Sequence, residues 1–157
     1  MKPRYEDMHP VLQARYDVFK ALAEQQSKVP FALVCVLRMP PEQVALHAQG
    51  RKPLAEVNRL RKLAGMPYMI TAAENKYKVT WTLNSKHFPD ANGKSRAFDI
   101  VVLKNGRTET WDLKWDGDKD AVADYEELAK MMELAGLVAG GFAFGDWPHG
   151  QLPQDVA

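Results

Sequence analysis

The sequence predicts an α+β fold in which a small antiparallel sheet is flanked by helices. Its apolar pattern changes irregularly between helical and extended segments, in the order helix, strand, helices, strand, hairpin, helix, strand. This order lacks the regular βαβ alternation that builds a parallel sheet. Because 157 residues suit one hydrophobic core better than two, we expect a single domain over residues 1–157.

The first part of the chain is expected to form a helix and then a strand. Apolar residues recur with helical spacing over 11–23, and this amphipathic helix is expected to end near Ser27. The apolar run 31–37 is rich in β-branched and aromatic residues. It therefore predicts a buried strand, with Arg38 at its exit.

Two helices and a short extended segment are expected next. Pro40 and Pro41 suit the first turn of a helix that Gly50 ends, and a second helix is expected over 54–64. Thr71 and Glu74 have the spacing of a capping box, which predicts the start of a short helix. The alternating run 77–82 then predicts a strand.

The remaining elements are a hairpin and a last helix. A polar loop over 84–96 leads to the apolar run 97–103, which predicts a buried strand. Asn105 and Gly106 are a strong hairpin signal, so the partner strand is expected within 108–113. Apolar spacing over 120–134 predicts an amphipathic helix, and a tail with several glycines follows it.

Composition argues against several classes of function. Lys and Arg total 21 against 20 Asp and Glu, and this balance gives no electrostatic basis for binding nucleic acid or an anionic membrane. Cys35 is the only cysteine, which excludes an intrachain disulfide and a cysteine-rich zinc site. The N-terminal residues resemble no signal peptide and no run suits a membrane helix, so we expect a cytoplasmic protein.

Four side chains in the second half of the chain are candidates for metal chemistry. Asp99 lies inside an apolar strand, where a carboxylate needs either an ion-pair partner or a metal. His87 and His149, each taken alone, are more often solvated or structural. As a set, two imidazoles and a carboxylate are ligands of a catalytic zinc, which keeps a fourth position for water. Asp146, three residues before His149, is then a candidate general base, although a surface turn would also explain it.

Short motifs in a fixed order resemble the zinc D-Ala-D-Ala carboxypeptidases and the related phage endolysins that cleave between L-Ala and D-Glu. The upstream motifs are Arg38, Glu42-Gln43 and Ala48-Gln-Gly-Arg51. The central and closing motifs are Ser85-Lys-His87, Gly93, Ala97-Phe-Asp99, Gly140-Gly141 and Asp146-Trp-Pro-His149. The likeness spans nearly the whole chain and implies the hedgehog/DD-peptidase fold.

The resemblance implies a role for each candidate. It makes His87, Asp99 and His149 the ligands of one Zn²⁺ ion and Asp146 the catalytic base. Arg38 would bind substrate or stabilise the oxyanion, although an exposed charge at a strand end is the ordinary alternative.

Three more residues are implied to bind substrate: Gln43, Ser85 and Trp147. A turn would equally explain Ser85, and packing against the core would explain Trp147. The loop between His87 and Asp99 is longer than is common in this family, and the segment 54–77 looks added.

The implied partner is the stem peptide of bacterial peptidoglycan, and the implied state is a monomer that reaches the wall after release from the cell. Hydrolysis of the L-Ala-D-Glu bond is the leading expectation. D-Ala-D-Ala carboxypeptidase or dipeptidase activity would use the same ligands and base. A zinc-stabilised wall-binding module without catalysis is the alternative of another class, and Asp146 argues against it because such a module has no need of a base.

Overall fold

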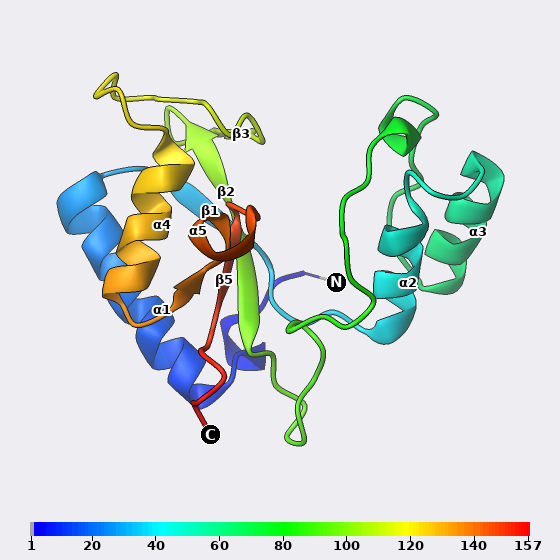
Figure 1. Ribbon diagram of the computed structural model, residues 1–157, viewed down its shortest axis with the longest axis horizontal. Coiled ribbons are helices and arrows are strands. Elements are labelled where there is room, and N and C mark those ends of the chain that lie inside the picture. The colour runs from blue at the N-terminus through cyan, green and yellow to red at the C-terminus, as the bar shows by residue number, and fades with distance from the viewer. Residues whose placement is uncertain (1) are drawn as a thin grey trace.

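The computed structural model describes residues 2–157 and confirms an α+β fold with a small antiparallel sheet. The chain forms two halves that lie side by side in Figure 1. One half holds the sheet with α1 (Pro10–Leu22), α4 (Asp124–Leu134) and α5 (Gly140–Phe144). The other half holds α2 (Pro40–Ala48) and α3 (Leu54–Leu63), with a short 3₁₀ turn, η3 (Glu74–Lys76).

The strand β2 (Ala97–Lys104) is the centre of the sheet, and its neighbours pair with it antiparallel. On one side lies β1 (Phe31–Cys35). On the other side β5 (His149–Gln151) pairs with the start of β2, and β3 (Thr108–Thr110) pairs with its end. The short β4 (Val138–Ala139) lies beyond β5. The predicted hairpin is confirmed, because Asn105 and Gly106 adopt the positive φ angles that its tight loop requires.

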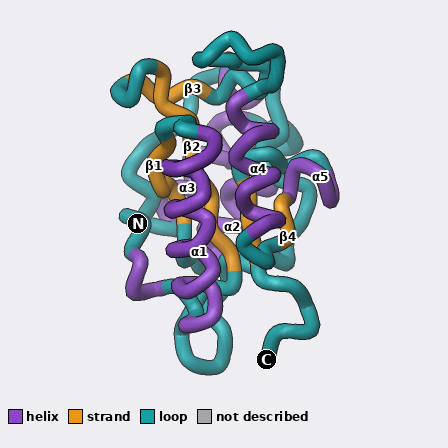
Figure 2. Tube along the Cα trace, turned by 90° about the vertical axis from the view of Figure 1, so that its left-hand side faces the viewer, coloured by secondary structure: helices purple, strands orange, loops and turns teal. Residues whose placement is uncertain are grey.

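The core lies between one face of this sheet and the helices α1 and α4, which run beside each other (Figure 2). Phe98, Ile100 and Val102 of β2 are fully buried there against Phe19 of α1 and Leu128 of α4. Because successive strand residues point to opposite faces, the residues between them point to the other face of the sheet. Asp99 is one of these residues.

Most predicted elements are confirmed. The first helix continues through a π-helical turn, η2 (Ala23–Ser27), and so ends at Ser27 as expected. The capping box before η3 is formed, since the backbone N–H of Thr71 donates to the Glu74 carboxylate and that of Glu74 donates to the Thr71 hydroxyl. Within residues 2–157, no helix has the length and apolar character needed to cross a membrane.

The predicted strand at 77–82 is wrong. Nothing in the described part of the chain pairs with this segment as a strand. Its alternating apolar side chains face solvent instead of a core, with Tyr77 70% and Trp81 78% exposed. An alternating pattern forms a strand only where a partner completes the backbone hydrogen bonds.

Two other predictions need smaller corrections. The strand predicted at 31–37 covers Phe31–Cys35 and is half-buried, because β1 is an edge strand of the sheet. The helix predicted from residue 120 begins at Asp124. Before it, the Asp116 and Asp120 carboxylates accept hydrogen bonds from nearby backbone N–H groups, and Ala121 has a φ of 70°, which a helix cannot contain.

Candidate metal centre

Strand register brings the predicted metal ligands together. Asp99 on β2 lies directly opposite His149 on β5 and opposite Cys35 on β1. Directly paired residues share a face of the sheet, so these three side chains form a row across it on the side away from the core. His87 reaches the same point from the loop before β2, and it is 2% exposed.

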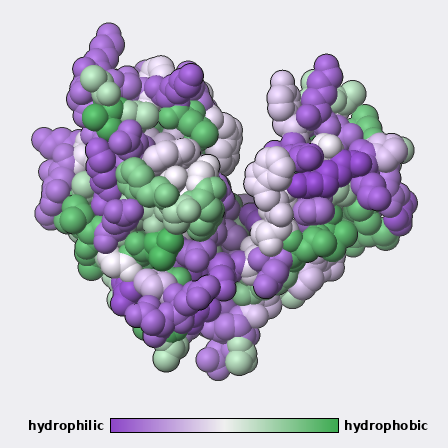
Figure 3. All heavy atoms as spheres, viewed as in Figure 1, coloured by the Kyte–Doolittle hydropathy of each residue, from purple (hydrophilic) through white to green (hydrophobic). Residues whose placement is uncertain are grey.

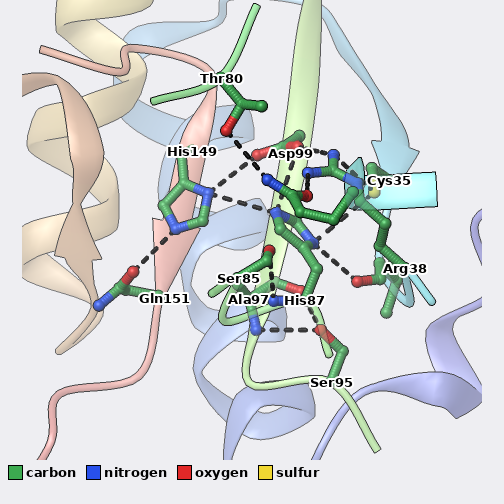
Figure 4. A network of polar contacts seen from close by, with 12 residues as sticks. Cys35, Arg38, Thr80, Ser85, His87, Ser95, Ala97, Asp99, His149 and Gln151 are labelled. Atoms are coloured by element: carbon green, nitrogen blue, oxygen red, sulfur yellow. Dashed lines mark hydrogen bonds and ion pairs between the residues drawn. The ribbon is translucent and has the colours of Figure 1, made fainter. Parts of the chain in front are cut away.

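Four polar atoms converge at this point (Figure 4). The Oδ1 atom of Asp99 lies 3.0 Å from Nδ1 of His149, and its Oδ2 atom lies 3.2 Å from Nε2 of His87. The two imidazole nitrogens are 3.3 Å apart. The histidines therefore face the carboxylate and each other across one small space.

In each histidine, the ring nitrogen that faces away from Asp99 forms a hydrogen bond to another group. His87 Nδ1 lies 2.7 Å from the Val36 carbonyl oxygen, which can only accept a hydrogen bond, so Nδ1 carries the hydrogen. His149 Nε2 donates in the same way to Gln151 Oε1 at 2.9 Å. In the neutral rings the lone pairs then lie on His87 Nε2 and His149 Nδ1, and both point at Asp99. Such outer partners fix the orientation of metal-binding histidines.

These distances fit a tetrahedral zinc ion. Zinc bonds to nitrogen and oxygen of about 2.0 to 2.1 Å place neighbouring tetrahedral ligands about 3.3 Å apart. The three separations among His87, Asp99 and His149 are 3.0, 3.2 and 3.3 Å. Two sets of possible ligands share Asp99, one with Cys35 and His87 and the other with Asp146 and His149, and the ligand atoms within each set lie within 4.8 Å of one another.

The electrostatics of the cluster favour a cation. Burial alone would raise the pKa of the Asp99 carboxyl, but His87 and His149 outweigh burial and hold that pKa well below its usual range. For His87, burial alone would lower the pKa, and the Asp99 carboxylate outweighs it and raises the pKa to about 10. The carboxylate thus stays ionised and keeps a positive charge beside it, which is either a proton or a metal ion.

The cluster lies on the floor of a cleft of about 1040 Å³ between the two halves, and Figure 3 shows the surface hollowed there. Trp111, Leu113 and Phe144 give the sheet side of this cleft an apolar wall. Arg61, Tyr68 and Lys78 line the opposite side. An open groove with a polar floor suits a chain-like substrate better than a small enclosed ligand.

Asp146 lies at the edge of the cluster formed by His87, Asp99 and His149. It lines the cleft, and one of its carboxylate oxygens lies within 4.8 Å of ligand atoms of Asp99 and His149. Although the residue is exposed as a whole, loss of hydration inside the cleft raises the pKa of its carboxyl, and the Asp99 charge adds to this effect. A carboxylate with a raised pKa beside a candidate metal site is suited to accept and return a proton.

The loop that carries Asp146 is held by Trp147, which packs against the core and against Phe142. The Trp147 ring covers Gly141 so closely that a Cβ atom on that glycine would overlap it. A Cβ on Gly140 would likewise collide with the Asp146 carbonyl. The glycine pair therefore lets this loop lie against α5.

Arg38 also reaches the cluster. One end of its guanidinium group donates to Asp99 Oδ2 at 3.3 Å and to Cys35 Sγ at 3.4 Å. The Ser85 hydroxyl accepts a hydrogen bond from the His87 backbone N–H at 3.1 Å, as in a turn.

All the predicted site residues line one cleft, and their roles stay predictions.

Sequence reasoning missed two neighbours of the site. Cys35 lies 3.6 Å from His87 through its sulfur, and Gln151 holds the outer nitrogen of His149. The position of Gln151 was a usable signal, because a side chain two residues along a strand shares a face with His149. No comparable local signal exists for Cys35, whose place depends on strand pairing.

Comparison with known proteins adds one relative. The chain is similar to a bacterial cell-wall peptidase. That protein is the peptidoglycan L-alanyl-D-glutamate endopeptidase CwlK of Bacillus subtilis (strain 168), 22% identical over 149 residues, which cover 94% of this chain and 74% of the relative. No family model matches the chain.

Proposed function

We propose that this protein is a zinc-dependent peptidase that hydrolyses the L-alanyl-D-glutamate bond in the stem peptide of peptidoglycan. The observation that carries the proposal is the convergence of His87 Nε2, His149 Nδ1 and the Asp99 carboxylate at separations of 3.0 to 3.3 Å. The likeness to CwlK, whose name states this bond, supports the choice of substrate.

The three converging side chains would hold the metal. When bound, zinc would acidify a water molecule and polarise the scissile carbonyl group. The hydrogen bonds to the Val36 carbonyl and to Gln151 keep the two ring lone pairs directed at the metal position.

Two further residues would act on the substrate. The Asp146 carboxylate would take the proton of the attacking water and return it to the leaving amine. Arg38, with a guanidinium group that borders both Asp99 and the cleft, would stabilise negative charge on the carbonyl oxygen of the peptide.

The shape of the site suits such a substrate. The cleft is open to solvent and is lined by residues from both halves of the molecule (Figure 3). Its mixed apolar and cationic walls match a peptide that carries both methyl groups and carboxylates. We place the enzyme among the endolysins, acting on the wall after release from the cell in which it is made.

Product analysis tests the proposal directly. Purified peptidoglycan of known chemistry is digested with the zinc-loaded protein, and the released peptides are identified by mass spectrometry. New N-terminal D-glutamate on the stem peptide is the expected product. Release of free D-alanine would instead establish a carboxypeptidase, and binding to the wall without any product would establish a non-catalytic module.

A further inference from the structure

The buried Gln43 side chain makes three hydrogen bonds beside the cleft. It is 1% exposed and lies in the second turn of α2, whose start is fixed by Pro40, Pro41 and the bond from the Met39 backbone N–H to Glu42. Its Oε1 atom accepts a hydrogen bond from Arg38 Nη1 at 2.9 Å. Its Nε2 atom donates to Thr80 Oγ1 at 3.0 Å and to the Thr82 carbonyl at 2.7 Å.

These bonds leave no free hydrogen on the amide for a substrate. Both N–H groups of Gln43 are used, and its burial keeps the remaining lone pair of Oε1 from the open cleft. The contact that reaches the chemistry is the one to Arg38. The Arg38 guanidinium forms hydrogen bonds through both terminal nitrogens. Its Nη1 atom donates to Gln43, and its Nη2 atom donates to Asp99 and Cys35.

We propose that Gln43 is a positioning residue that fixes the plane of the Arg38 guanidinium and does not itself contact substrate. This inference rests on the proposed role of Arg38 in the peptidase. Without Gln43, the remaining side-chain partners of Arg38 all lie at Nη2, and the group can turn about that end. Arg38 then spends less time in the orientation that stabilises the reacting carbonyl.

Gln43 also connects Arg38 to the exposed segment that borders the cleft. Thr80 and Thr82 belong to the segment 77–82, which no strand supports. The same buried amide thus holds this segment and the arginine in one arrangement. Its loss would loosen both, so the test must separate the two effects.

A double-mutant cycle separates them. Gln43→Met keeps the length of the side chain and removes all three hydrogen bonds. A hydrogen bond to a charged group contributes about 1.5 to 3 kcal/mol, so we expect kcat to fall by about 10-fold to 100-fold with a smaller change in KM. In an Arg38→Met background, Gln43→Met should lower kcat by less than about 2-fold, because its target is gone.

Gln49 provides the matched control. It is also a buried glutamine of the same half, 6% exposed, and it donates to the Glu74 carbonyl with no bond to Arg38. Gln49→Met should therefore have the same effect on kcat with and without Arg38. Equal losses from Gln43→Met in both backgrounds would overturn the proposal.

A readout independent of activity decides the same point. In ¹⁵N spectra, the side-chain signals of Arg38 are those lost in Arg38→Met. Hindered rotation of its guanidinium should be seen in the wild type and should be lost in Gln43→Met, while Gln43→Glu, which keeps an acceptor for Nη1, should retain it. Unchanged Arg38 signals in Gln43→Met would refute the positioning role, whereas absence of wall hydrolysis by the wild type would refute only the proposed function.

Discussion

The Nε2 atom of His87 and the Nδ1 atom of His149 lie 3.3 Å apart. In each ring the second nitrogen carries the hydrogen and donates it, to the Val36 carbonyl in His87 and to Gln151 in His149. Two neutral rings in these tautomers cannot hydrogen-bond to each other. Something positive must lie between them and the Asp99 carboxylate, either a proton or a metal ion. This relationship underlies the first two predictions.

Removal of any predicted ligand should remove the metal. We expect about one zinc ion per chain in the purified protein, and strong loss of zinc in His87→Ala, Asp99→Ala and His149→Ala, measured by elemental analysis after gel filtration. His47→Ala is the control, because His47 lies on α2 away from the cluster. Full zinc content in all three ligand variants would contradict the assignment.

Zinc binding should release a proton from His87. In the metal-free protein the pKa of His87 is raised to about 10, so between pH 7 and 9 its Nε2 atom holds a proton that zinc must displace. The apparent Kd for zinc should therefore fall as pH rises, by about tenfold per unit from this group alone. Competition with a chromophoric chelator at several pH values measures it. Asp146→Asn should keep this slope, and an affinity that does not change with pH would contradict the prediction.

Asp146→Asn should separate chemistry from metal binding. The three predicted ligands are untouched, so zinc content should match that of the wild type. Hydrolysis of wall peptide should fall by about 10² to 10⁴, which is the usual contribution of a general base. Both quantities are measured on one preparation, with Asp155→Asn as a control near the C-terminus. Near-normal hydrolysis with zinc present would show that another group accepts the proton.

Gly141→Ala should damage the loop that carries Asp146. The added methyl group would overlap the Trp147 ring, which must move away from α5. Such overpacking typically costs about 1 to 3 kcal/mol of unfolding free energy. The rate of wall-peptide hydrolysis should fall by more than the loss of unfolding free energy alone explains, because Asp146 and His149 flank Trp147. Gly106→Asn, in an open hairpin turn, should lower thermal stability less, because nothing lies within 4 Å of the added Cβ and asparagine adopts positive φ more readily than other residues with a side chain.

Glu127→Gln should stabilise the protein near neutral pH. Burial raises the pKa of Glu127 to about 8, helped by a hydrogen bond to Asp120 and by the charges of nearby aspartates, and its Oε2 atom is buried without a hydrogen-bond partner among the described residues. Between pH 4.5 and about 8, Glu127 is ionised in the unfolded chain but protonated in the folded protein. The free energy of unfolding therefore falls as pH rises through this range.

The substitution removes that dependence. Because Glu127 is partly exposed, we expect a gain of no more than about 1 to 2 kcal/mol at pH 8 and almost none at pH 4. Chemical denaturation at the two pH values measures the difference. Glu126→Gln, a half-buried neighbour that pairs with Lys130 at the surface, is the control. Equal stability of Glu127→Gln and wild type at pH 8 would argue against the raised pKa.

The helices and the central hairpin could be predicted because each has a local signature. Proline starts α2, and Asn105 with Gly106 closes the hairpin. The segment 77–82 could not be predicted correctly, since its pattern is that of a strand and only the absence of a partner prevents one. The start of α4 was missed because Asp116 and Asp120 bond to the backbone in a turn that competes with the helix.

The candidate site shows the same limit. The motifs predict His87, Asp99 and His149 as one set, and the structure brings the three side chains together, yet the place of Cys35 depends on an irregularity of pairing. Ala32 pairs with Val101 and Leu33 with Ile100, and a bulge then shifts the register so that Cys35, not Val34, lies opposite Asp99. One extra residue in an edge strand leaves no trace in the local sequence pattern.

Because β2 presents core residues on one face and Asp99 on the other, an error in its strand register would disturb both the core and the candidate site. If the strand slipped by one residue against its neighbours, Asp99 would enter the apolar layer below α1 and α4, and a bulky core side chain would project among the histidines. The misassembled chain would lose both its core packing and the convergence of the three predicted ligands. If zinc binds as proposed, only molecules with the correct pairing gain the extra protection against proteolysis that a bound ion provides.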